Sequence, residues 1–198
     1  MLHVSCPPTH ATRITLGAAA GMLTALDTLI DARAHVKWPN DVVLPAPAKA
    51  RVHGRIGPFR KVAGLLVEVA RSAPAPRDDV EVVVVGIGVN VDAPLEGWPE
   101  ALELTAGALV DAGFKGTSDD VLVAVRAHVP DAVGRALREV AATLAVLRER
   151  SATIGRRVDV DGVVGIARDF ADDGALVIED DAGARHTVRA GDVWIAGT

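Results

Sequence analysis

The order of apolar and polar positions predicts a strand followed by a helix at the start of the chain. An apolar run at 2–6 ends at a Pro-Pro pair and predicts a short strand. From Thr12 to Asp31, apolar residues recur every three or four positions, which predicts a helix with one apolar face. Gly17 and Gly21 lie in this segment, and we expect them to allow close packing of the helix against a sheet.

Four further strands are expected between residues 34 and 91, at 34–38, 42–44, 62–70 and 80–91. The last two flank a Pro-rich turn at 72–79, so we expect them to pair antiparallel. The unbroken valines of 80–91 predict burial on both faces of that strand. Residues 45–60 are rich in Pro, Gly, Ala and Arg without periodicity, and we expect a loop there.

Two more helical regions follow. Residues 99–112 form the first, with Pro99 suited to its first position and Gly113 to its C-terminal cap. Residues 118–150 keep the spacing of three and four and predict one or two helices, which Pro130 should kink or split.

Beyond Ile154 the pattern changes to short β runs separated by turns, at 156–160, 163–168, 175–179, 185–188 and 193–195. Five short strands of this kind suit a small barrel, with Trp194 in its core. We therefore expect two domains, a core at 1–150 and a small barrel at 151–198.

Composition narrows the class of protein. The chain has 198 residues, is 49% hydrophobic and carries a net charge of −5, which argues against a nucleic-acid-binding surface. Cys6 is the single cysteine, so a disulfide framework and a multi-cysteine zinc site are excluded. The six histidines show no ligand spacing, so we expect no structural metal. No apolar run reaches the ~20 residues of a membrane span. We expect a cytoplasmic protein.

Three short clusters carry candidate chemistry: KWPND at 37–41, KVAGLLVE at 61–68 and GIGVN at 86–90. Taken singly, each has a plain structural explanation, namely a turn, a bulge beside an exposed lysine, and a pair of glycines at a strand end. Most basic residues are Arg, so a Lys indicates a place where a compact ammonium is needed. This weak signal points to Lys37 and Lys61.

In this order and spacing, the three clusters resemble the core motifs of biotin protein ligases. LHVSCPP at 2–8 resembles the strand after the family's biotin loop, Trp98 in EGWPEALEL resembles the tryptophan of its adenylate-covering loop, and the five terminal strands resemble its C-terminal barrel of the Src-homology-3 type. The resemblance implies an α+β fold. Its mixed, largely antiparallel sheet is packed with helices, as in class II aminoacyl-tRNA synthetase-like and biotin–lipoate ligase cores.

The resemblance also implies a two-step reaction with ATP, biotin and magnesium. Biotin's carboxylate attacks the α-phosphate of ATP to give biotinyl-5′-adenylate, and a lysine of a biotin carboxyl carrier domain then attacks the adenylate. By this resemblance Lys61 is catalytic, because a compact cation can follow the moving negative charge. The implied nucleotide- or adenylate-binding residues are Asn40, Asp41, Asn90 and Trp98. The implied biotin-binding residues are Gly64, Leu66 and Gly86.

The chain departs from the family's pattern in two places. The family carries a Gly-Arg-Gly-Arg-type loop upstream of the first strand, whereas this chain starts at Met1, so we expect weak biotin binding and little carrier biotinylation. The segment 45–60 is longer than usual, and its basic residues, Arg60 among them, could reach phosphate or form a solvated loop. No DNA-binding or membrane partner is expected, and a homodimer is left open.

Two other functions compete with a ligase. One is a non-catalytic module that binds a nucleotide or a carrier domain, which the expected absence of the wrapping loop favours. The other is the related lipoate ligase or octanoyl transferase branch, which KWPND and the terminal strands fit less well.

Overall fold

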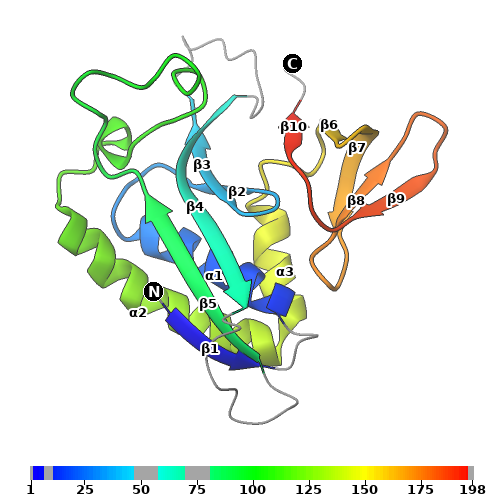
Figure 1. Ribbon diagram of the computed structural model, residues 1–198, viewed down its shortest axis with the longest axis horizontal. Helices are drawn as coiled ribbons and strands as arrows, with labels where there is room; N and C mark the ends of the chain where they lie inside the picture. Colours follow the sequence, from blue (N-terminus) through cyan, green and yellow to red (C-terminus); the bar gives the residue numbers. More distant parts are fainter. Residues whose placement is uncertain (1, 7–10, 47–57, 70–80, 196–198) are drawn as a thin grey trace.

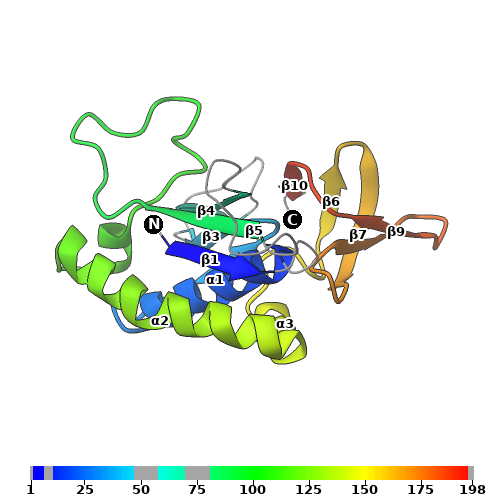
Figure 2. The ribbon, with the colours of Figure 1, turned by 60° about the horizontal axis from the view of Figure 1, so that its bottom comes forward.

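The computed structural model describes residues 2–6, 11–46, 58–69 and 81–195, which form two five-stranded sheets and three α-helices (Figure 1). Along the described chain, β1 to β5 form the first sheet, α1 follows β1, and α2 and α3 follow β5. Strands β6 to β10 form the second sheet. Figure 2 shows the first sheet, α1 and α2 as successive layers, with the second sheet beside them.

The first sheet has the strand order β1-β5-β4-β3-β2, and every neighbouring pair is antiparallel. Its strands are β1 (Leu2–Cys6), β2 (His35–Lys37), β3 (Asp41–Pro45), β4 (Phe59–Val69) and β5 (Glu81–Val89). The expected antiparallel pairing of the third and fourth predicted strands is confirmed, with Leu65 opposite Ile87. Residues 47–57 and 70–80, where a loop and a turn were expected, lie outside the described residues, as does the side chain of Cys6.

Only one face of this sheet is covered by a described helix. Val83 and Val85 are fully buried on the side of α1 (Ala11–Asp27), whereas Leu66 on the opposite face is 57% exposed and Gly88 is exposed as well. The prediction that both faces of β5 are buried was therefore wrong. A continuous run of valines is typical of a strand that is buried on both faces. In β5 the valines also occupy both faces, but a described helix covers only one of them.

Helix α1 packs mainly against α2 (Ser118–Arg138), and its glycines lie at that crossing. A Cβ on Gly17 would lie 2.6 Å from Val133 Cα, and one on Gly21 would lie 2.7 Å from Val129 Cα. The expected packing of these glycines against a sheet was wrong, because the backbone that approaches them closely belongs to α2.

Helix α2 runs through Pro130 and ends at Arg138, and α3 (Val140–Glu149) begins after Glu139. The two helices therefore separate at Glu139 and not at Pro130 as expected. At its start, the Thr117 hydroxyl accepts a hydrogen bond from Asp120 N while the Asp120 carboxylate accepts one from Thr117 N, a reciprocal cap. None of the helices in the described part of the chain is long and apolar enough to cross a membrane.

The expected helix at 99–112 was wrong. The segment forms turns at 100–105 and a short 3₁₀ helix, η2 (Leu109–Ala112), which ends at Gly113 in the left-handed region with φ 88°. Lys61 N donates to Thr105 O at 2.7 Å, and Gly107 N donates to Lys61 O at 2.9 Å. Because strand β4 takes these backbone groups, the segment cannot use them for a continuous helix.

The second sheet has the strand order β10-β6-β7-β8-β9, with every neighbouring pair antiparallel. Its strands are β6 (Arg157–Val160), β7 (Val163–Phe170), β8 (Leu176–Glu179), β9 (Arg185–Val188) and β10 (Val193–Ile195). All five short strands were predicted. The expected placement of Trp194 in the core was wrong, because its side chain is 44% exposed on an edge strand.

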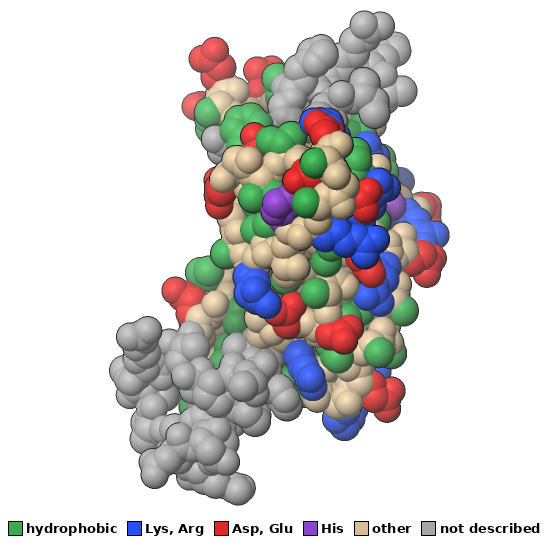
Figure 3. All heavy atoms as spheres, turned by 90° about the vertical axis from the view of Figure 1, so that its right-hand side faces the viewer, with side chains coloured by type: hydrophobic (Ala, Val, Ile, Leu, Met, Phe, Trp, Pro, Cys, Tyr) green, Lys and Arg blue, Asp and Glu red, His purple; other side chains and the backbone are tan. Residues whose placement is uncertain are grey.

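Charged side chains of both signs alternate over the second sheet, as Figure 3 shows for the face on that side of the molecule. The pairs include Arg157 with Asp181 at 2.7 Å and Arg168 with Glu179 at 2.7 Å. Exposed pairs of this kind contribute only about 0–1 kcal/mol each to stability. They neutralise one another locally without forming a patch of one sign.

The two sheets share one hydrophobic core, and Trp38 joins them. Its indole nitrogen donates to Gly174 O between β7 and β8 at 2.9 Å, and its backbone nitrogen donates to Thr153 Oγ1 at 3.0 Å. The Arg148 guanidinium adds a bond to the Asp169 carboxylate at 2.6 Å. These contacts fix the second sheet beside the KWPND turn.

Candidate active site

The KWPND segment divides its side chains between the core and the open side of the sheet. Trp38 is only 4% exposed and points toward the second sheet. Asn40 lies in the turn after β2. Its side-chain amide nitrogen donates to Leu65 O at 2.7 Å, and its main-chain carbonyl oxygen accepts from Leu65 N at 2.9 Å. The turn is therefore bound to the middle of β4, and this fixes the position of Asp41.

Asp41 lies between two lysines. Its carboxylate is 2.6 Å from the Lys61 ammonium and 3.8 Å from the Lys37 ammonium. Lys37 is buried, at 6% exposed, whereas the Lys61 side chain is 45% exposed. Of the two lysines beside this carboxylate, Lys61 is therefore the more accessible.

Asn90 follows β5 and forms hydrogen bonds with β4 and with the segment at Gly107. Its backbone nitrogen donates to Val62 O at 2.8 Å, and its amide nitrogen donates to Gly107 O at 3.0 Å and to Lys61 O at 3.3 Å. The carboxamide oxygen remains the part of this side chain that can accept a hydrogen bond from a ligand.

These side chains line one cleft of about 630 Å³. Its wall consists of Lys37, Asp41, Lys61, Asn90, Trp98, Ala101, Leu102, Thr105, Ala106, Asp192 and Val193. The structure therefore brings together four of the residues expected from the sequence: Lys61, Asp41, Asn90 and Trp98.

The other expected site residues lie outside this wall. Asn40 uses its amide group on the backbone of β4. Gly64, Leu66 and Gly86 lie on the neighbouring strands β4 and β5, on the sheet face that no described helix covers. Gly86 is directly opposite Leu66 in the strand register. They form a small, partly apolar surface on that face, and their contact with biotin stays a prediction.

Sequence reasoning did not place Lys37 and Asp192 in the site. The small number of lysines in the chain had singled out Lys37 as a place where a compact ammonium is needed, but not as a residue of this cleft. Nothing in the sequence pointed to Asp192, because its position in the cleft depends on how the second sheet packs against the first.

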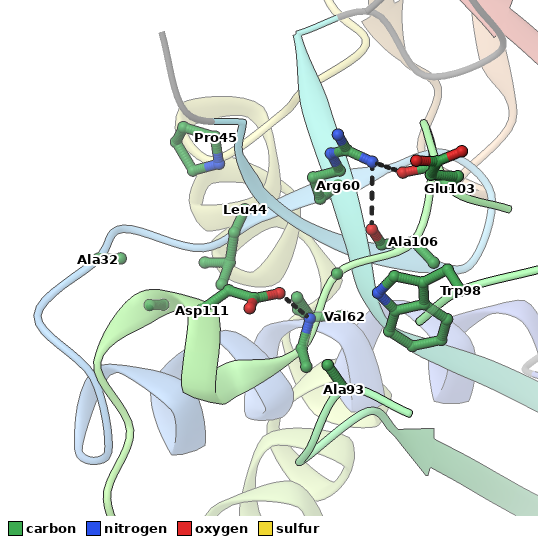
Figure 4. Close-up of a pocket in the computed structure, with 13 residues that line it drawn as sticks. Ala32, Leu44, Pro45, Arg60, Val62, Ala93, Trp98, Glu103, Ala106 and Asp111 are labelled. Carbon is green, nitrogen blue, oxygen red and sulfur yellow. Dashed lines mark hydrogen bonds between the residues drawn. The ribbon is translucent and has the colours of Figure 1, made fainter. Parts of the chain in front are cut away.

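A second cavity of about 630 Å³ lies on the other side of the segment 105–107, and Trp98 lines both (Figure 4). Its floor is apolar, with Leu44 and Val62, and the Asp111 carboxylate accepts a hydrogen bond from Ala108 N at 2.9 Å. The Arg60 guanidinium donates to Glu103 O and Ala106 O. It therefore binds the segment that carries the cleft wall, and this corrects the expectation that it belongs to a solvated loop.

His35 lies at the edge of the same region, on β2. Its ring centroid is 5.6 Å from that of Phe59, and Arg156 lies 5.1 Å from the Phe59 ring centre. Its Nδ1 is buried and has no hydrogen-bond partner among the residues that the structure describes. Burial first, and then the charges of Arg150, Arg33 and Arg156, lower the pKa of His35 below 6.5.

Comparison with known proteins shows which family the chain resembles. Residues 153–195 match the family model of the biotin protein ligase C-terminal domain. The biotin–[acetyl-CoA-carboxylase] ligase of Mycobacterium tuberculosis (strain ATCC 25618 / H37Rv) is 33% identical over 199 residues, which cover 91% of this chain. By these matches the chain is similar to biotin protein ligases along most of its length. It spans 61% of the length of that relative.

Two further biotin protein ligases are similar to the chain. The ligase of Paracoccus denitrificans is 34% identical over 108 residues, covering 54% of this chain and 36% of that protein. The structure of biotin protein ligase from Aquifex aeolicus in complex with biotin and ATP superposes with a TM-score of 0.72 at 19% identity, covering 100% of this chain and 78% of that one. The fold is therefore shared with these ligases, and the predicted resemblance is confirmed.

Proposed function

We propose that this chain carries the ATP side of the active site of a biotin protein ligase, which forms biotinyl-5′-adenylate and transfers biotin to a lysine of a biotin carboxyl carrier domain. One observation carries the proposal. The accessible ammonium of Lys61, bound to Asp41, lines the same cleft as the Asn90 carboxamide and the Trp98 indole. A cation, a polar amide and an aromatic ring are the groups that a phosphate linked to a purine nucleoside requires.

In the first step, a biotin carboxylate oxygen would bond to the α-phosphorus of ATP while the bond to pyrophosphate breaks. An anion approaches a polyanion, so positive charge must already be in place. Lys61 supplies this charge at the cleft surface, and Lys37 adds a second, buried cation on the other side of Asp41. In the second step, the carrier's lysine nitrogen would bond to the adenylate's carbonyl carbon and AMP would leave.

The nucleotide and biotin would occupy neighbouring parts of the sheet. Trp98 and Asn90 would bind the nucleotide, and Asn40 would hold the turn that positions Asp41. Leu66 and Gly86, on the uncovered face of β4 and β5, would contact the apolar part of biotin. The Aquifex aeolicus ligase of the same fold has been solved with both biotin and ATP, which supports two adjacent subsites.

Magnesium would accompany ATP rather than occupy a protein cage. Among the described residues, no group of three or more His, Cys, Asp or Glu side chains could hold a metal ion. The carboxylates that line the cleft are Asp41 and Asp192, and Mg²⁺ commonly binds one or two carboxylates together with substrate phosphates. The ion would neutralise phosphate charge.

The finer architecture belongs to the same proposal. We assign residues 1–150 to a ligase core of the class II synthetase type and 151–198 to a small barrel of the Src-homology-3 type, working in the cytoplasm. The match of 153–195 to the family's C-terminal domain and the separate second sheet support this division.

A titration of this chain with a non-hydrolysable biotinyl-5′-adenylate analogue tests the proposal. We expect the chain to bind the analogue and Lys61→Ala to weaken binding at least about tenfold, because a charge-assisted contact contributes roughly 1.5–3 kcal/mol. Lys115→Ala, which removes an exposed lysine outside the cleft, is the matched control.

Pyrophosphate exchange separates the ligase from a binding module. Biotin-dependent exchange of labelled pyrophosphate into ATP, lost in Lys61→Ala and kept in Lys115→Ala, would support adenylate chemistry. Tight binding of the analogue without exchange would favour the non-catalytic module instead. Equal binding by the chain and by Lys61→Ala would contradict the role given to Lys61.

A further inference from the structure

The register of β4 changes just where Lys61 must face the cleft. Asp41 is opposite Gly64 and Val42 is opposite Ala63, but Val43 is opposite Lys61, so Val62 is an extra residue in the ladder. On a regular strand, residues 61 and 64 would point to opposite faces because side chains alternate. A one-residue bulge shifts that alternation. It therefore brings the Lys61 side chain to the face that Gly64 occupies.

On that face the Lys61 side chain passes over Gly64 to reach Asp41. A Cβ built on Gly64 would lie 3.2 Å from both Lys61 Cε and Lys61 Nζ, and, its chain neighbours Ala63 and Leu65 aside, no other described residue comes within 4 Å of it. Gly64 is also the strand partner of Asp41, which accepts the ammonium at 2.6 Å. The end of the lysine side chain thus lies closer to this position than a Cβ normally allows, and a methyl group there would push it aside.

The neighbouring glycine on β5 differs in this respect. Gly88 is directly opposite Gly64 in the register, yet a Cβ on Gly88 would meet nothing within 4 Å among the described residues. Both glycines lie on the same uncovered face, so a general need for small residues there does not distinguish them. What distinguishes Gly64 from Gly88 is the contact that a side chain at position 64 would make with Lys61.

We infer that Gly64 is a positioning residue for Lys61. Its missing side chain allows the ammonium to lie across the strand and bind Asp41, and the bulge at Val62 directs Lys61 onto that path. This role goes beyond contact with biotin. It rests on the proposed function only in naming Lys61 as the group that acts on the phosphate. The geometry itself involves only residues of the chain.

NMR of the lysine side chains in the ligand-free chain tests the inference. The chain has four lysines, Lys37, Lys49, Lys61 and Lys115, so ¹³Cε labelling gives few signals, and Lys61→Arg assigns the relevant one. A side chain held in one conformation shows two different Hε protons, whereas a freely rotating one shows a single averaged signal. The variants are Gly64→Ala and its matched control Gly88→Ala.

We expect two Hε signals for Lys61 in the original chain and in Gly88→Ala, and one averaged signal in Gly64→Ala. In an Asp41→Asn background the Lys61 signals should already be averaged, and adding Gly64→Ala should change nothing further. Trp98 and the nucleotide play no part in this readout, so its outcome is independent of whether the chain proves to be a ligase.

Three results would overturn the inference. The first is an unchanged pair of Lys61 signals in Gly64→Ala, and the second is an equal loss in Gly64→Ala and Gly88→Ala. The third is a Gly64→Ala chain that does not fold, since the end of one flexible side chain is all that the new methyl group would meet.

Discussion

At the scale of single residues, His35 shows how a polar group is tolerated near the site. Its ring is half-buried between β3 and Phe59, and three arginines disfavour its protonated form. The neutral imidazole fits this place because it adds no charge to an already cationic surrounding. Protonation in the folded state therefore costs more than protonation in the unfolded chain.

Stability should consequently fall as the pH falls below about 6.5. The pKa of His35 is lowered in the folded protein, so the unfolded chain binds more protons in this window, and the free energy of unfolding increases with pH there. We expect His35→Gln to make the decline between about pH 7 and pH 5 shallower. Urea unfolding at several pH values measures this, and identical slopes for the two proteins would contradict it.

At the scale of secondary-structure elements, the crossing of α1 and α2 depends on two glycines. Gly17 and Gly21 are one helical turn apart, and each faces the backbone of α2 at a distance that leaves no room for a methyl group. Glycine lowers the intrinsic stability of a helix by about 1 kcal/mol relative to alanine. The close contact of the two helices offsets this loss.

Gly17→Ala should therefore destabilise the protein even though alanine is the better helix former. We expect a loss of about 1–3 kcal/mol from overpacking, measured by chemical denaturation. Gly134→Ala in α2 is the control, because its Cβ would meet only the end of the Arg138 side chain, at 3.3 Å. That variant should gain about 0.5–1 kcal/mol. A gain of similar size for Gly17→Ala would show that the crossing is looser than the structure indicates.

At the scale of the whole molecule, Trp38 links the candidate site to the second sheet. It sits two residues before Asn40 in the sequence, and its indole nitrogen binds the Gly174 carbonyl. The same packing brings Asp192 and Val193 of the second sheet into the cleft wall. The cleft is therefore complete only when both sheets are in contact.

Trp38→Phe should weaken this contact while preserving most of the apolar burial. It leaves the Gly174 carbonyl without its indole donor, which we expect to cost about 1–3 kcal/mol in the free energy of unfolding. Trp194→Phe, at an exposed position, should cost less. Thermal and urea unfolding compare the two variants, and an equal loss in both would argue against Trp38 as the link between the sheets.

Local patterns determined most of the secondary structure. The amphipathic spacing from Thr12 to Asp31 was enough to predict α1, and the change to short β runs beyond Ile154 was enough to locate the strands of the second sheet. The helix predicted at 99–112 failed because its backbone groups at 105 and 107 pair with Lys61, about forty residues earlier. Such a long-range partner leaves no mark in a window of neighbouring residues.

The motifs likewise pointed to the candidate site residues, and the tertiary structure decided how their side chains are arranged. The family resemblance of the three clusters, which is specific only when they are taken together, pointed to Lys61, Asp41 and Asn90. The resemblance of EGWPEALEL pointed to Trp98. That Asn40 binds the strand backbone, that Lys37 lies buried beside Asp41, and that Gly64 makes room for an ammonium depend on strand register and on a one-residue bulge. Register is set by contacts between distant segments, so only the folded chain decides it.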